Sequence, residues 1–190
     1  MRTIVLVHGA WHGPWCWSPV LARLDEQGIP AVAVELGLMD VHEDAAIVTR
    51  ALDEVGGPAL LVGHSYGGIV ITEAGVHPSV ERLVYVCAYA VDEDETVIGV
   101  TLDHDEQPDL AAAMQLLPDG TSTLDPALVG AALYADCDAA DVDRAVVPSP
   151  QRHLADRIPD VALVEYPTSS HSPFFSHPGE LADLLASLSA

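Results

Sequence analysis

The most informative stretch of the chain is Ala59-Leu60-Leu61-Val62-Gly63-His64-Ser65-Tyr66-Gly67-Gly68. Its first four residues predict a short buried strand, and residues 67–74 predict a helix that leaves it. The pentapeptide between them has the form G-x-S-x-G, in which a sharp strand-to-helix turn holds the central serine in a strained backbone conformation. Only glycine-sized neighbours let the two arms pass so closely. We therefore expect the turn to lift Ser65 Oγ clear of a sheet and to point the Tyr66 N–H toward any anion formed there.

Composition and charge fit a single folded domain, and no cofactor is expected. The chain has 190 residues, 49% of them hydrophobic, which is enough for one sizeable core. A net charge of -22 argues against nucleic acid and anionic membrane surfaces as partners. All seven basic residues are arginine, and the absence of lysine excludes Schiff-base and PLP chemistry. The scattered Cys16, Cys87 and Cys137 indicate reduced thiols, so a cytoplasmic location is expected.

Strands and helices are predicted to alternate along most of the chain. Strands are expected at residues 3–7, 29–36, 59–62, 82–89 and 161–166, and helices at 19–27, 43–55, 67–74 and 180–188. The helix over 43–55 places Ala46, Ile47, Ala51 and Leu52 on its predicted apolar face. Strands separated by single helices pair in parallel through right-handed crossovers. The expected fold class is α/β, with a doubly wound, mostly parallel sheet.

Residues 92–150 break this alternation. They are acidic and alanine-rich, with short predicted helices at 110–117 and 126–134. An insertion at this point follows the fourth strand, where it can fold over a site at the strand ends. We predict a small helical cap over 92–150 and a core made of 1–91 and 151–190; the alternative is a solvated surface excursion.

A second functional segment, residues 8–17, begins where the first strand ends. Acyl transfer needs at least two backbone donors aimed at the developing oxyanion. The Tyr66 N–H is one candidate and the Ala10 N–H the other, since Gly9 lets the chain turn tightly enough to present it. His8 and His12 lie on a predicted loop with no glutamate after His8, which argues against a zinc site.

A third segment, residues 168–178, follows the last predicted strand. A serine hydroxyl is a poor nucleophile until a neighbouring base takes its proton. His171 is the best-placed base, and His177, which precedes Pro-Gly-Glu at the start of the final helix, is second. His64 is expected to be structural, because adjacent side chains diverge from the turn.

These three segments resemble the α/β-hydrolase superfamily, and within it the branch of small plant-type esterases and hydroxynitrile lyases that has many bacterial members. The resembling motifs are H-G-A-x-H-G-x-W-x-W around Ala10, G-H-S-Y-G-G around Ser65 and H-S-P-F-F-S-x-P from His171. The resemblance runs from residue 4 to the end. It implies a shortened α/β-hydrolase fold with Ser65 as nucleophile, His171 as base, and the Ala10 and Tyr66 amides as oxyanion hole.

The resemblance also separates esterase from lyase. The lyase members carry threonine where Ala10 stands and lysine directly after the catalytic histidine. Here that second position is Ser172, and the chain has no lysine. An esterase is therefore favoured.

The catalytic acid is the weakest part of the match. Family members are several dozen residues longer and supply their aspartate from a further strand, for which the sequence shows no convincing counterpart. Asp143 keeps the family's spacing from the aspartate to Gln151. The alternatives are an exposed surface role for Asp143, or an acid at Asp92, Glu93 or Asp94 after the strand over 82–89.

The expected activity is hydrolysis of small apolar carboxylic esters through an acyl-enzyme on Ser65, with no metal. The expected substrate pocket consists of Trp11, Trp15, Met114, Phe174 and Phe175. Two alternatives stay open: a non-catalytic small-ligand binder, and a lyase or cyclase that reuses the pocket. The sequence leaves the oligomeric state open.

Overall fold

The computed structural model describes residues 1–91, 109–137, 161–166 and 168–190. The chain divides into two compact units. The first consists of Met1–Ala90 and His177–Ala190, and the second of Val91–Ser176. The predicted cap over 92–150 is described only at 109–137, and its role as a cap stays a prediction.

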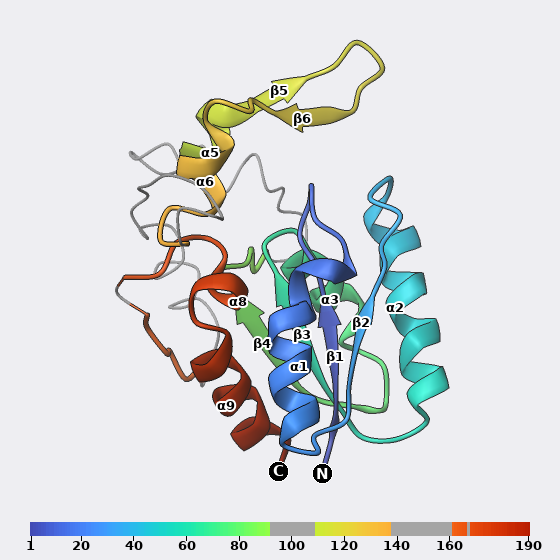
Figure 1. The fold of residues 1–190 in the computed structure, drawn as a ribbon. Helices are drawn as coiled ribbons and strands as arrows, with labels where there is room; N and C mark the ends of the chain where they lie inside the picture. The colour runs from blue at the N-terminus through green and yellow to red at the C-terminus, as the bar shows by residue number, and fades with distance from the viewer. Residues whose placement is uncertain (92–108, 138–160, 167) are drawn as a thin grey trace. The chain divides into compact units, whose positions relative to one another are not determined.

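A parallel sheet forms the centre of the first unit (Figure 1). Its strands are β1 (Thr3–Val7), β2 (Ala31–Val34), β3 (Ala59–His64) and β4 (Val80–Val86), in the order β2-β1-β3-β4. Val5 pairs with Val32 on one side and Leu61 on the other. All three neighbouring pairs run parallel, so the four strands end at one edge of the sheet. The predicted fold class is confirmed.

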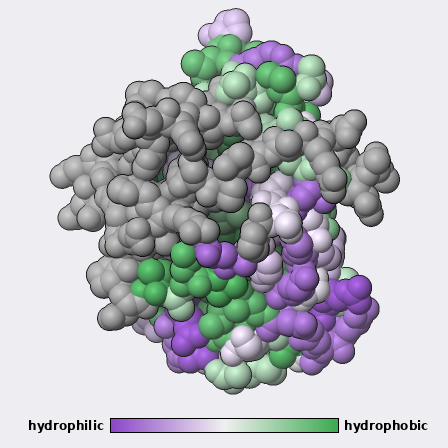
Figure 2. Space-filling view, turned by 90° about the vertical axis from the view of Figure 1, so that its left-hand side faces the viewer, coloured by the Kyte–Doolittle hydropathy of each residue, from purple (hydrophilic) through white to green (hydrophobic). Residues whose placement is uncertain are grey.

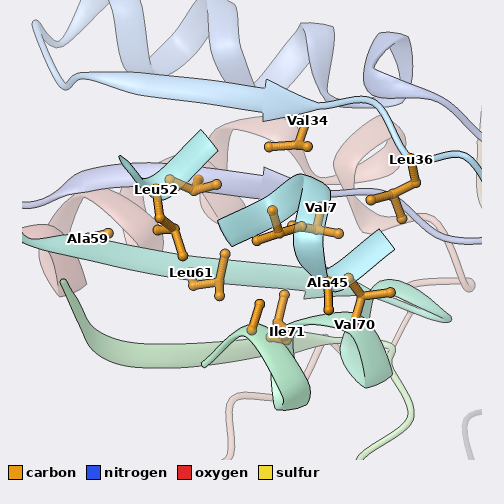
Figure 3. Packing of buried hydrophobic residues seen from close by; sticks show 12 residues of the cluster. Val7, Val34, Leu36, Ala45, Leu52, Ala59, Leu61, Val70 and Ile71 are labelled. Atoms are coloured by element: carbon orange, nitrogen blue, oxygen red, sulfur yellow. The ribbon is translucent and has the colours of Figure 1, made fainter. Parts of the chain in front are cut away.

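Helices cover both faces of this sheet (Figure 1). They are η1 (Pro14–Trp17), α1 (Ser18–Glu26), α2 (Val41–Val55), α3 (Gly67–Ala74) and α9 (Pro178–Ser189). Figure 3 shows α2 and α3 packing their apolar side chains on one face, with Leu52, Val70 and Ile71 against Val7 and Leu61. Successive strand side chains alternate between faces. Ile4, Leu6, Leu60 and Val62 therefore point to the other face, where α1 and α9 pack against each other.

Local capping explains the ends of α2. The Asp40 side chain accepts hydrogen bonds from the N–H groups of His42 and Glu43, and Gly56 ends the helix with φ of 65°. The predicted apolar face of this helix is partly wrong. Ala46 is exposed, and the buried positions are Asp44, Ala45, Val48 and Leu52.

The second unit is built from short elements: α5 (Asp109–Ala113), β5 (Met114–Leu116), β6 (Ser122–Leu124), α6 (Val129–Leu133) and α8 (Pro173–Ser176). The predicted helix over 110–117 ends early, because β5 pairs antiparallel with β6 across a turn with Gly120 at φ of 87°. The predicted helix over 126–134 is shorter too. The Asp125 side chain accepts from the Ala127 N–H at 2.8 Å and holds a turn before α6.

The predicted strand at 161–166 is wrong: these residues adopt no regular secondary structure. Val161, Leu163 and Val164 are exposed. A run of β-branched and apolar residues becomes a strand only when another strand pairs with it, and none of the described strands does.

Two observations concern the surface. In the described part of the chain, no helix is both long enough and apolar enough to cross a membrane. Figure 2 shows a hydrophobic patch beside hydrophilic areas in the lower part of the face that it displays. Apolar atoms make up a large part of any folded protein's surface, so such a patch is ordinary.

Candidate active site

Ser65 lies between the end of β3 and the first turn of α3. Its φ is 52°, in the left-handed region that residues other than glycine seldom adopt. Such a conformation costs on the order of 1–3 kcal/mol and persists only where the surroundings impose it. The Ser65 N–H donates to the Val86 carbonyl at 3.3 Å, and its carbonyl accepts from Gly68 at 2.9 Å and Tyr89 at 3.2 Å. These bonds tie the strained residue to its own helix and to the chain after β4.

Three glycines are sterically required at this turn. A Cβ on Gly63 would collide with the Gly67 carbonyl, and one on Gly67 would come within 2.7 Å of the Val7 and His8 carbonyl oxygens. A Cβ on Gly68 would lie 2.7 Å from the Ala88 side chain. Contacts this short force the neighbouring backbone or side chain to move. These three glycines of G-H-S-Y-G-G therefore cannot be replaced by a larger residue without rearrangement.

The loop after β1 packs directly against Ser65. A Cβ built on Gly9 would lie 2.8 Å from Ser65 Cβ and 2.9 Å from His64 Nδ1. The structure thus brings the Gly9-Ala10 peptide beside the predicted nucleophile, with Tyr66 following it in the chain. Trp11, the next residue of the loop, has φ of 58°.

His8 is a buried structural member of this loop. Its Nε2 accepts the Leu36 N–H at 3.1 Å, so Nδ1 carries the ring proton and donates it to the Gly9 carbonyl at 2.9 Å. Burial lowers the pKa of His8, against the opposing effects of the Gly9 hydrogen bond and the charge of Asp44. A neutral imidazole with both nitrogens hydrogen-bonded holds the backbone of Gly9 and Leu36 in place. The sequence did not predict this structural role for His8.

Tyr66 is held by a buried carboxylate that the sequence analysis missed. Its hydroxyl donates to Asp44 Oδ2 at 2.8 Å. Asp44 Oδ1 accepts the N–H groups of Gly37 at 2.7 Å and Leu38 at 3.2 Å. Burial and the Asp44 carboxylate raise the pKa of Tyr66, which keeps the phenol protonated as a donor.

Aromatic rings pack within and against the loop that follows β1. His12 stacks on Trp15 with ring centroids 5.6 Å apart, and His64 meets His12 edge-on at 5.6 Å and Trp17 at 6.4 Å. His64 and Trp17 are fully buried, whereas Trp15 is 54% exposed. Burial lowers the pKa of His12.

The other predicted site residues lie in the second unit. His171 is half-buried in the turn before α8. Phe174 and Phe175 meet edge to face at 4.9 Å, and Tyr134 packs on Phe175 at 5.9 Å. Met114 lies on β5 and is 43% exposed.

A second carboxylate missed by the sequence analysis, Asp136, interacts electrostatically with the turn that carries His171. Burial pushes the pKa of Asp136 up, but hydrogen bonds from the Ser170 and Ser176 side chains and the Ser170 backbone hold it below its ordinary value. The predicted acid Asp143 and its alternatives Asp92, Glu93 and Asp94 lie outside the described residues. Within the described residues, no cluster of three His, Cys, Asp or Glu side chains could hold a metal.

Comparison with known proteins identifies the family. Residues 4–143 match the alpha/beta hydrolase family. The chain belongs to this family. This confirms the predicted resemblance.

The curated relatives include esterases and a lyase. A carbendazim hydrolyzing esterase from Nocardioides sp. (strain SG-4G) is 33% identical over 120 residues, 53% of this chain and 47% of that protein. Putative methylesterase 12 of Arabidopsis thaliana is 28% identical over 54% of this chain and 34% of its own length. An alpha-hydroxynitrile lyase of the same plant is 28% identical over 74% of this chain and 63% of its own length. Each match spans less than two thirds of the relative.

Solved structures show the same fold. A pyrethroid hydrolase from Sphingobium faniae JZ-2 superposes with a TM-score of 0.84 at 21% identity, covering 99% of this chain and 97% of that one. A mutant polyneuridine aldehyde esterase superposes with a TM-score of 0.81 at 15% identity, covering 100% and 99%.

Proposed function

We propose that the protein is a serine hydrolase that cleaves small apolar carboxylic esters through an acyl-enzyme on Ser65. The observation that carries the proposal is the left-handed backbone of Ser65 at the end of β3, with Gly9 packed against it. Strained backbone of this kind is concentrated at functional sites. The names of the relatives, among them an esterase and a methylesterase, support the same reaction class.

In the proposed mechanism Ser65 Oγ attacks the ester carbonyl carbon while His171 takes the hydroxyl proton. The Ala10 and Tyr66 N–H groups donate to the oxyanion that forms. The tetrahedral intermediate collapses, the alcohol leaves with the proton from His171, and Ser65 keeps the acyl group. A water molecule then gives a proton to His171 and attacks the acyl carbon, which releases the acid and restores Ser65.

The catalytic acid is proposed from the spacing between Asp143 and Gln151 in the sequence. A carboxylate on Nδ1 of His171 would hold its tautomer and stabilise the imidazolium. Asp143 remains the first candidate and Asp92 the second. Asp136 joins them because Ser170, the residue before His171, lowers the pKa of the Asp136 carboxyl.

The proposed substrates are short-chain or aryl esters. Trp11, Trp15, Met114, Phe174 and Phe175 would line an apolar pocket, and no cationic side chain stands among them. A lyase is disfavoured because Ser172 follows His171 and the chain has no lysine. A cytoplasmic enzyme without a nucleic-acid partner fits the charge of -22 and the free cysteines.

The test is ester turnover with and without the nucleophile. Ser65→Ala should reduce hydrolysis of p-nitrophenyl acetate by several orders of magnitude, on the order of 10⁶ where the groups act as a unit. Ser187→Ala, which removes an exposed hydroxyl on α9, is the matched control and should retain full turnover. If Ser65→Ala keeps most of the activity, the proposal is wrong. If the unmutated protein binds esters without turnover, it is a binder, and a product other than acid and alcohol would indicate a lyase or cyclase.

A further inference from the structure

The loop after β2 uses three consecutive backbone donors to hold two buried side chains. The Leu36 N–H donates to His8 Nε2 at 3.1 Å. The Gly37 and Leu38 N–H groups donate to Asp44 Oδ1 at 2.7 and 3.2 Å. Leu38 adopts a φ of 57°. His8 is 1% exposed and Asp44 is fully buried, so neither side chain can turn to solvent instead.

The second ring nitrogen of His8 fixes one proposed oxyanion donor. Its Nδ1 donates to the Gly9 carbonyl at 2.9 Å. In a planar trans peptide the carbonyl and the following N–H point in opposite directions. By holding the Gly9 carbonyl, the ring therefore sets the direction of the Ala10 N–H.

The second carboxylate oxygen of Asp44 fixes Tyr66, the residue that carries the second proposed donor. Its Oδ2 accepts the Tyr66 hydroxyl at 2.8 Å. Tyr66 stands at the first turn of α3, directly after the strained Ser65. A hydrogen bond to a buried carboxylate is stronger than one between neutral groups, so it restrains the side chain and, through it, the Tyr66 backbone.

We infer that loop 36–38 sets the relative position of the two oxyanion donors, with His8 acting on the Ala10 N–H and Asp44 acting on the Tyr66 N–H. His8 and Asp44 are positioning residues, since neither is assigned contact with the substrate. The inference rests on the proposed function and extends it to residues far from Ser65 in the sequence. A purely structural role for Asp44, stabilising the start of α2, is the competing explanation.

Tyr66→Phe is the cleanest perturbation. It removes the hydroxyl but leaves the Gly37 and Leu38 bonds to Asp44 in place. Removing an oxyanion donor costs about 10²–10³ in kcat, so a donor that is loosened but present should cost about 10-fold. KM for p-nitrophenyl acetate should stay within about twofold, because ground-state binding does not use the oxyanion.

Asp44→Asn is the conservative variant, and Tyr85→Phe is the matched control. The asparagine oxygen can accept both loop N–H groups while its NH₂ donates to the Tyr66 oxygen, so the restraint on Tyr66 is weakened but kept, and kcat should fall by less than in Tyr66→Phe. Tyr85 bonds to Thr72 Oγ1 at 2.9 Å within the same unit. Loss of the Tyr85 hydroxyl should lower the urea midpoint without changing kcat, and by less than Tyr66→Phe does, because the Tyr85 partner is neutral.

The experiment measures kcat, KM and the affinity for trifluoroacetone, whose hydrate-forming carbonyl captures a nucleophilic serine as a tetrahedral oxyanion. We expect kcat and trifluoroacetone affinity to fall together in Tyr66→Phe, to fall together by a smaller factor in Asp44→Asn, and to stay unchanged in Tyr85→Phe. A folded Tyr66→Phe with unchanged kcat and affinity overturns the inference while leaving the proposed function intact. If the unmutated protein hydrolyses no ester, the proposed function fails and this inference fails with it.

Discussion

Gly9→Ala tests whether the loop after β1 lies as close to Ser65, the proposed nucleophile, as the structure places it. The new Cβ would lie 2.8 Å from Ser65 Cβ, so it must retreat by about 0.6 Å to reach the 3.4 Å at which ordinary contact begins. His64, fully buried, offers no room on the other side, since its Nδ1 would be 2.9 Å away. The loop must therefore move, and the Ala10 N–H moves with it.

Two effects of Gly9→Ala can be given magnitudes. Overpacking of this kind destabilises a fold by about 1–3 kcal/mol. A misplacement of about 1 Å in a catalytic group costs about 10²-fold in rate, so a shift of about 0.6 Å should lower kcat by between about 10-fold and 100-fold.

The assay is p-nitrophenyl acetate hydrolysis together with urea unfolding. Gly57→Ala is the control, because a Cβ there meets nothing within 4 Å, and it should leave kcat unchanged. A folded Gly9→Ala protein with kcat within twofold of the unmutated protein would contradict the proposal that Gly9 packs against the nucleophile.

Three further predictions concern the acid, the effect of pH and the substrate. Asp143→Asn should cut kcat by about 10⁴-fold, with much smaller effects of Asp92→Asn and Asp136→Asn; a dominant loss in either of the latter would move the acid to that residue. Burial lowers the pKa of His8 and His12, so their contribution to stability is complete above the unfolded value of about 6.5 and is lost as pH falls toward the lowered folded value. The fall in the urea midpoint between about pH 7 and about pH 5 should therefore be shallower in His12→Gln, and an equal slope would contradict this. Acetate and butyrate p-nitrophenyl esters should turn over faster than long-chain esters; the reverse order would argue against a small pocket.

Local sterics made the nucleophile turn predictable from sequence. The glycines at 63, 67 and 68 are needed by contacts within a few residues or with the adjacent strand ends. The strand Thr3–Val7 and the helix Gly67–Ala74 begin and end where the sequence places them, because Arg2 and His8 flank the strand and Gly67 and Gly75 mark the two ends of the helix. Signals of this kind need no knowledge of the rest of the fold.

Long-range pairing was not predictable. The run at 161–166 has the composition of a strand, yet strand formation depends on a partner elsewhere in the chain. The hairpin of β5 and β6 likewise replaced a predicted helical turn, because pairing of residues 114–116 with 122–124 outweighs the helix propensity of Met114 and Leu116.

The burial of Asp44 could have been predicted from the sequence. It stands four residues before Val48 and eight before Leu52, so it falls on the buried face of α2. A carboxylate on an apolar face requires hydrogen-bond donors. The sequence does not reveal that these donors are the N–H groups of Gly37 and Leu38 and the Tyr66 hydroxyl, since they come from two segments far apart in the chain.

Covalent labelling tests the central claim most directly. The unmutated protein is treated with a fluorophosphonate, digested, and analysed by mass spectrometry to locate the adduct. Only a serine activated by a base and an oxyanion hole reacts quickly with this reagent. We predict a single rapid adduct on Ser65 that is absent from Ser65→Ala. Absence of labelling, or an adduct on another serine, would contradict the assignment of Ser65 as the nucleophile.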